Sequence, residues 1–84
     1  MNKVLRKDES IFQSHELSLV AALVAWGFPI LYINKDDPKK VTFYFSNSPQ
    51  LTQSVHSFWS NTKEILPIKY FDALRQCKSR IYGG

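Results

Sequence analysis

The residues of this sequence best suited to chemistry are cations placed near tyrosines. The segment from Lys63 to Arg80 carries five positive and two negative charges, and the whole chain has a formal net charge of +4. Lysine and arginine neutralise phosphates, and an exposed tyrosine ring stacks on a base. The candidate nucleic-acid contacts predicted on this basis are Lys39, Lys40, Lys69, Arg75, Lys78, Arg80, Tyr44 and Tyr82. Binding of this kind is weak, sensitive to salt and not sequence-specific.

The arrangement of the cations on the last predicted helix leaves a second interpretation open. At about 100° per residue, Arg75, Lys78 and Tyr82 fall along one border of its apolar stripe. Lys69 and Arg80 fall along the opposite border. A helix dedicated to nucleic acid usually gathers its cations on one solvent face, whereas long side chains that straddle a stripe can simply cover the core. The sequence does not choose between phosphate binding and a solvated basic surface.

Three neighbours, Ser14, His15 and Glu16, have the residue types of a hydrolytic triad. Neighbours on a helix point about 100° apart, so they cannot form the hydrogen-bonded relay that a triad needs. We expect Ser14 to cap the N-terminus of a helix instead, because its hydroxyl can accept from an unpaired backbone N–H group. The sequence thus predicts a protein that is not an enzyme.

Metal-binding and redox chemistry are not expected either. His56 has no companion at the spacing of a metal site, and Asp36 with Asp37 offers too few oxygen ligands for a hard cation, so turn formation is the better reading of these aspartates. The single cysteine, Cys77, falls on an apolar helix face without an expected cationic neighbour. We expect no metal and no cofactor. Because one cysteine cannot form an internal disulfide, a cytoplasmic location is the simplest prediction.

The elements that must position these residues surround one uncharged run of seventeen residues, 17–33, which reads LSLVAALVAWGFPILYI. Its length is near the lower limit for a membrane span, and the cations before it resemble those of a secretory signal. Gly27 and Pro29 interrupt the run, however, and N-terminal acids cancel the preceding cations. The prediction is therefore a buried helix from Leu17 to Trp26 followed by a strand, with no membrane span.

A β-hairpin is predicted from residues 30–33 and 41–45, which are rich in β-branched and aromatic residues. Phe43 and Phe45 share one face of the second strand, and Tyr44 lies on the other. Two strands alone are marginally stable in water. The hairpin must therefore pack on helices, recruit the segment around Ile11 as a third strand, or pair with another copy of the chain.

Two more helices are predicted towards the C-terminus. Ser48 and Pro49 are typical of a helix start, and the first of the two runs to about Ser60. It is expected to bury Leu51, Val55, Phe58 and Trp59 and to turn outward Gln50, Gln53, Ser54 and Ser57. The last helix runs from Pro67 to about Tyr82. Its expected apolar face consists of Tyr70, Phe71, Leu74, Cys77 and Ile81.

These elements predict a small α+β fold with a central apolar helix, a hairpin with a candidate third strand, and two C-terminal helices. Residues 11–84 are expected to form one domain, preceded by a flexible arm over residues 1–10.

Several aromatic and helix-ending residues together resemble a known family. They are Phe12, Ser14, a Leu/Ala-rich helix ending in Gly27, Phe43-Tyr44-Phe45, Phe58-Trp59 and Tyr70-Phe71-Asp72-Ala73-Leu74. Over residues 11–82 the sequence resembles a family of small uncharacterised prokaryotic and phage domains. The resemblance implies a prokaryotic or mobile-element source and carries over no active site.

Two functions are therefore kept as hypotheses. The first is a non-catalytic accessory module in nucleic-acid transactions. The alternative is an interaction module that binds a partner or forms a homodimer, either through the open edge of the hairpin or through Trp59 and the last helix.

Overall fold

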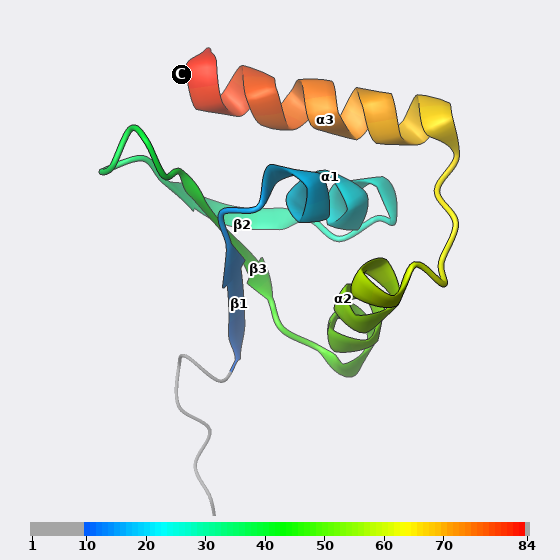
Figure 1. Ribbon diagram of the computed structural model, residues 1–84. Coiled ribbons are helices and arrows are strands. Elements are labelled where there is room, and N and C mark those ends of the chain that lie inside the picture. The colour runs from blue at the N-terminus through cyan, green and yellow to red at the C-terminus, as the bar shows by residue number, and fades with distance from the viewer. Residues whose placement is uncertain (1–9, 84) are drawn as a thin grey trace, which may run out of the picture.

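A computed structural model describes residues 10–83, which form three strands and three helices (Figure 1). In chain order these are β1 (Ile11–Ser14), α1 (Leu17–Ala25), β2 (Ile30–Asn34), β3 (Thr42–Ser46), α2 (Pro49–Ser60) and α3 (Pro67–Tyr82). The α+β class and the element order are as predicted, and the segment at Ile11 is the third strand. The predicted arm, residues 1–10, lies outside the described residues except for Ser10.

Helix α1 ends as predicted but begins differently. Gly27 has a φ of +101°, and two backbone hydrogen bonds close the last turn: Gly27 N–H to Val24 O and Phe28 N–H to Leu23 O, both 3.0 Å. This pattern is a Schellman motif, which favours glycine because a side chain at that φ is strained. The expectation that Ser14 caps the helix is wrong. Ser14 ends β1, and its Oγ accepts from the N–H of Glu16 at 3.0 Å, because the chain turns there before the helix begins.

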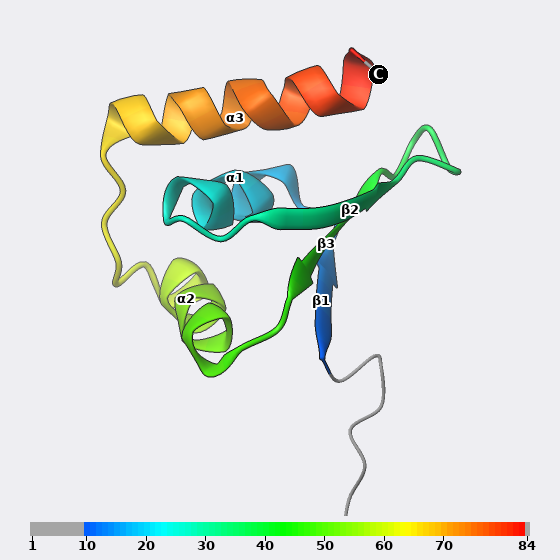
Figure 2. The same ribbon diagram turned by 180° about the vertical axis from the view of Figure 1, so that it is seen from behind.

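Helix α1 is surrounded by the other elements (Figures 1 and 2). It packs most extensively against α3, while the sheet and α2 lie on its other sides. Five consecutive residues, 19–23, are buried, so no side of the helix middle faces water. The core joins α1 to side chains from every neighbouring layer and consists of Leu19, Val20, Leu23, Phe43, Phe45, Leu51 and Cys77.

The sheet has the strand order β1-β3-β2, and both pairings are antiparallel. Phe43 and Phe45 of the central strand are buried, which confirms the predicted alternation. Because β1 covers one side of β3, the hairpin keeps only one open edge, that of β2.

Strand β2 contains an irregularity that changes which residues face the core. Ile30 pairs with Phe45 but Tyr32 pairs with Tyr44, so Leu31 is an extra residue on its strand. Such a β-bulge shifts the alternation of the side chains by one position. As a result Ile30 and Ile33, three residues apart, both pack against the core, while Tyr32 lies on the outer face of the sheet.

Helix α2 starts as predicted, with the Oγ of Ser48 accepting from the N–H of Leu51 at 3.0 Å. Two expectations about its faces are wrong. Ser54, predicted to point outward, is 4% exposed, and the Nζ of Lys63 donates to its hydroxyl at 3.2 Å. Trp59, predicted to be buried, is 60% exposed. The side of α2 that carries Ser54 therefore faces Lys63 of the linker that leads to α3.

Helix α3 rests on α1 through one face, formed by Tyr70, Ala73, Leu74, Cys77 and Ile81. Phe71, predicted to lie on this face, is 60% exposed. The small Ala73 is buried in its place and lets the two helices approach closely. Among the helices within residues 10–83, none has the length and hydropathy needed to cross a bilayer.

The bulged register of β2 leads to a prediction about the stability of two variants. Replacing Ile33 by Ala should lower the free energy of unfolding by about 1–2 kcal/mol, because the side chain packs against the core without being fully buried. Leu31→Ala, the matched control on the same strand, should change it by less than about 0.5 kcal/mol because that side chain is exposed. Urea denaturation followed by circular dichroism measures both. Equal losses in the two variants would contradict the bulged register.

Candidate nucleic-acid interface

A shallow groove of about 320 Å³ lies between β2 and the last turns of α3. It is lined by Leu31, Tyr32, Ile33, Lys35 and Arg80. The groove exists because α3 packs on α1 and therefore ends beside the open edge of β2. It brings two cations and a tyrosine together from segments more than forty residues apart.

Two tyrosines meet on the outer face of the sheet next to this groove. The ring centroids of Tyr32 and Tyr44 are 5.3 Å apart and their planes are tilted by 49°. The two residues are opposite each other in the β2–β3 ladder, where side chains on one face are in contact. Tyr44 is half-buried and Tyr32 is 59% exposed, so Tyr32 presents the more accessible ring.

The loop between β2 and β3 is held by its own polar groups. The N–H of Asp36 donates to Asn34 Oδ1 at 2.8 Å, and the N–H of Lys39 donates to Asp37 Oδ1 at 2.9 Å. Lys40 N–H donates to the carbonyl oxygen of Asp37 at 3.0 Å. The turn chemistry expected of the two aspartates is therefore present at Asp37, while before Asp36 the side chain of Asn34 has this role. Lys39 and Lys40 are exposed, in the loop that projects at the end of the molecule where α3 terminates (Figures 1 and 2).

The remaining predicted cations lie elsewhere on α3. Arg75 and Lys78 are on the side away from α1, in an exposed row that we call the outer stripe: Ile68, Phe71, Arg75, Lys78 and Tyr82. Arg75 Nη1 pairs with Asp72 Oδ1 at 3.3 Å, in a pair that is largely solvent-exposed. Lys69 is eleven residues before Arg80, or about 17 Å along the helix axis. The structure therefore does not gather the eight predicted residues into one site.

Cys77 faces the core directly beneath this end of α3. Burial raises the pKa of its thiol above the ordinary value of 9.0, and the positive charge of Arg80 acts in the opposite direction. No cation was expected near this cysteine from the sequence. Arg80 lies almost one helical turn later, but burial prevails, so the thiol is neutral at neutral pH and is a poor nucleophile.

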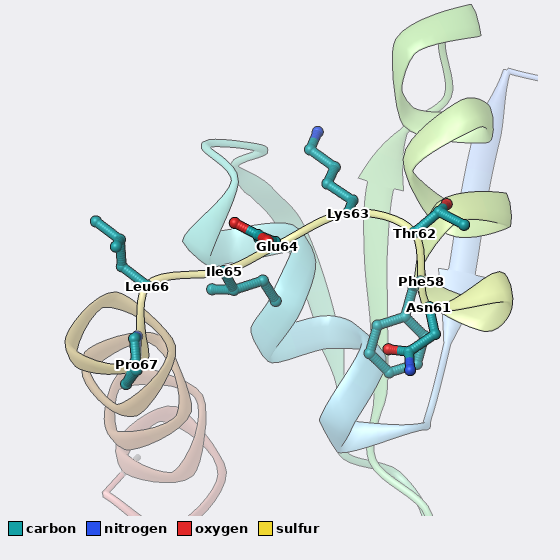
Figure 3. A pocket seen from close by; sticks show the side chains of 8 residues that line it. All are labelled: Phe58, Asn61, Thr62, Lys63, Glu64, Ile65, Leu66 and Pro67. Atoms are coloured by element: carbon teal, nitrogen blue, oxygen red, sulfur yellow. The ribbon is translucent and has the colours of Figure 1, made fainter.

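A larger pocket, of about 860 Å³, follows the linker between α2 and α3. Figure 3 shows Phe58 and Asn61 at one end of it and Pro67 at the other. Lys63 and the backbone of Glu64 hold the linker against Trp26 at the end of α1. The Nζ of Lys63 lies 4.6 Å from the centroid of the Trp26 ring, and Trp26 Nε1–H donates to the carbonyl oxygen of Glu64 at 3.1 Å. These contacts position α3 and offer no pairing of nucleophile and base.

Metal chemistry finds no support in the part of the chain that the structure describes. No three His, Cys, Asp or Glu side chains within residues 10–83 lie where they could hold a metal ion.

Of the residues that line the groove, only Arg80 was among the predicted contacts; the tyrosine and the other cation, Tyr32 and Lys35, were not. A regular alternation along β2 places Tyr32 on the same side as Ile30, facing the core, and only the bulge reverses this. The presence of Ile at positions 30 and 33, three apart, was the available signal. Lys35 had no such signal, because its significance depends on where α3 ends.

The family predicted from the aromatic pattern is confirmed by one comparison. A family model described as a domain of unknown function, DUF5659, matches residues 9–83, which includes the whole range of the predicted resemblance, 11–82. No curated protein and no solved structure matches the chain.

The raised pKa of Cys77 gives a pH-dependent contribution to stability. A thiol whose pKa is higher in the folded protein than in the unfolded chain contributes stability that is complete below the unfolded pKa and is lost as the pH rises through the folded pKa. Urea denaturation from pH 7 to pH 10 should therefore show the wild type losing stability above about pH 9 relative to Cys77→Ala. A constant difference between the two proteins over this range would show that the thiol is not shifted.

Proposed function

The chain belongs to the DUF5659 family of domains of unknown function. For this member of the family we propose the role of a small non-catalytic accessory module that binds nucleic acid weakly and without sequence preference. We further propose that the protein is cytoplasmic and comes from a prokaryote or a mobile element. The single cysteine and the resemblance noted above support that setting.

The observation that carries the proposal is the convergence of Lys35 and Arg80 in the groove beside Tyr32. The described residues that line the groove include no carboxylate, so the two cations act together on an approaching anion. Lys39 and Lys40 extend the positive surface along the β2–β3 loop. Nucleic acid is an anionic polymer, and neighbouring cations gain affinity for it by releasing its condensed counterions.

The same arrangement explains why binding is weak. Few phosphates can reach the groove at once, and Asp36 and Asp37 in the adjacent loop partly offset its charge. Non-specific affinities of this kind are about 10⁻⁴ to 10⁻⁶ M at physiological salt. Contacts to phosphates position a protein without reading the bases, so no sequence preference follows from these cations.

A second candidate function, self-association, is favoured by the outer stripe of α3. Residues of the outer stripe are spaced alternately by three and four positions, which is the spacing of residues at a helix–helix interface. Two of its apolar side chains are largely exposed, Ile68 at 71% and Phe71 at 60%. In an antiparallel pair of copies, Phe71 of one chain would face Lys78 of the other. The two copies of Arg75 would meet at the centre, however, and their repulsion ranks this candidate second.

Arg80→Gln and Lys69→Gln form a matched pair for the first candidate, because each removes one exposed cation from the same helix. Arg80→Gln should weaken binding to a generic oligonucleotide and reduce the slope of log affinity against log salt by about 1. Lys69→Gln, at the far end of α3, should leave the slope nearly unchanged. Fluorescence anisotropy between 20 and 200 mM salt measures this. Equal effects would show that binding is not centred on the groove.

The self-association candidate predicts a dimer that persists in high salt. Phe71→Ser should convert it to a monomer, because the apolar contact is lost, whereas Tyr32→Ser on the sheet should not. Sedimentation equilibrium over a range of protein concentrations distinguishes the two species. A wild-type protein that stays monomeric at millimolar concentration would exclude this function.

A further inference from the structure

The side chain of Tyr32 lies outside the hydrophobic core. Its side chain is 59% exposed, although rings of this size usually contribute much of their area to burial. The residues that anchor the strand, Ile30 and Ile33, pack against the core on the opposite face of the sheet. The bulge at Leu31 thus holds the ring outward, where a ligand can reach it.

Tyr44 restricts the position of this ring. It contacts Tyr32 from the central strand at a centroid distance of 5.3 Å, and it is itself half-buried. A ring supported on one side loses less freedom when a flat molecule stacks on its other side. The pair therefore forms a preorganised aromatic surface at the edge of the groove.

The groove joins the ring to positive charge. Tyr32, Lys35 and Arg80 all line it, and the ring of Tyr32 lies on the outer face of the sheet at its edge, so a molecule that stacks on the ring can extend towards the two cations. A nucleotide matches this combination, since it carries a flat base next to a phosphate. A proline-rich peptide would use the ring but not the cations, and an acidic peptide would use the cations but not the ring.

Stacking on Tyr32 requires a base whose face is free. In a duplex the faces of each base are covered by its neighbours above and below, and only the base edges and the sugar-phosphate backbone are accessible. In a single strand the bases can be splayed out and stacked on aromatic side chains, a contact that tolerates any base. The ring therefore distinguishes single strands from duplexes, whereas the cations alone do not.

We propose that Tyr32 is a base-stacking site and that the preferred ligand of this protein is single-stranded nucleic acid. Tyr44 supports the ring, and Lys35 and Arg80 bind the phosphates next to the stacked base. This inference rests on the proposed nucleic-acid binding and adds to it the class of ligand and the residue that selects it.

Three fluorescent probes test the inference with the 84-residue chain at low salt. They are an oligothymidylate of about 12 nucleotides, an abasic oligomer with the same number of phosphates, and a duplex of the same length, all within the site sizes of such surfaces. The wild type should bind the oligothymidylate about tenfold more tightly than the abasic oligomer, because only the former can stack.

Variants of the ring identify the residue responsible. Tyr32→Leu should weaken binding of the oligothymidylate about tenfold and leave the abasic oligomer and the duplex unaffected. Tyr32→Phe keeps the ring and should keep the wild-type affinity. Tyr82→Leu, which removes an exposed tyrosine from α3, is the matched control and should change none of the three affinities. Urea denaturation of each variant establishes that it is folded.

The outcomes separate this inference from the function on which it rests. If the wild type binds no probe at low salt, the proposed nucleic-acid binding fails and the stacking site fails with it. If it binds all three probes equally and Tyr32→Leu changes nothing, phosphate binding stands and the stacking site is overturned. The same holds if Tyr82→Leu, rather than Tyr32→Leu, lowers the affinity for the oligothymidylate.

Discussion

Burial of α1 on all sides is the constraint on which the rest of the structure depends. A helix whose middle residues, 19–23, are all apolar and buried cannot be stable with a single neighbour, because any uncovered side would expose apolar surface to water. The sheet, α2 and α3 each cover part of it (Figures 1 and 2). The positions of the other elements follow from this requirement, including that of α3, whose last turn carries Arg80.

The candidate binding groove is a consequence of two features that serve the core. The bulge at Leu31 lets Ile30 and Ile33 both reach the interior, and the same shift in alternation exposes Tyr32. The docking of α3 on α1 covers the central helix and at the same time brings Arg80 to the edge of β2. No residue of the groove had to be placed by an element devoted to binding.

Much of the fold follows from local chemistry that the sequence displays directly. Gly27 at a positive φ and Ser48 as a helix cap are decided within a few residues, and both are as predicted. The outward position of Tyr32 depends on a one-residue bulge, and the role of Lys35 depends on the end of a distant helix. Of the predicted contacts, Arg80 lines the groove and Tyr44 packs against the ring of Tyr32. The others lie on the β2–β3 loop or elsewhere on α3. Local patterns therefore predicted the elements well and the composition of the site only in part.

The attachment of α3 has a consequence for how stable the groove itself is. Helix α3 packs chiefly on α1 through one face and is joined to the rest of the chain by the short linker over residues 61–66. Such an element can detach in a local unfolding event that leaves the sheet intact. The groove is present only while α3 is docked, so a ligand that bridges Lys35 and Arg80 would stabilise the docked state by mass action. Occupancy of the groove and hydrogen-exchange protection of α3 are in this way two readouts of one equilibrium.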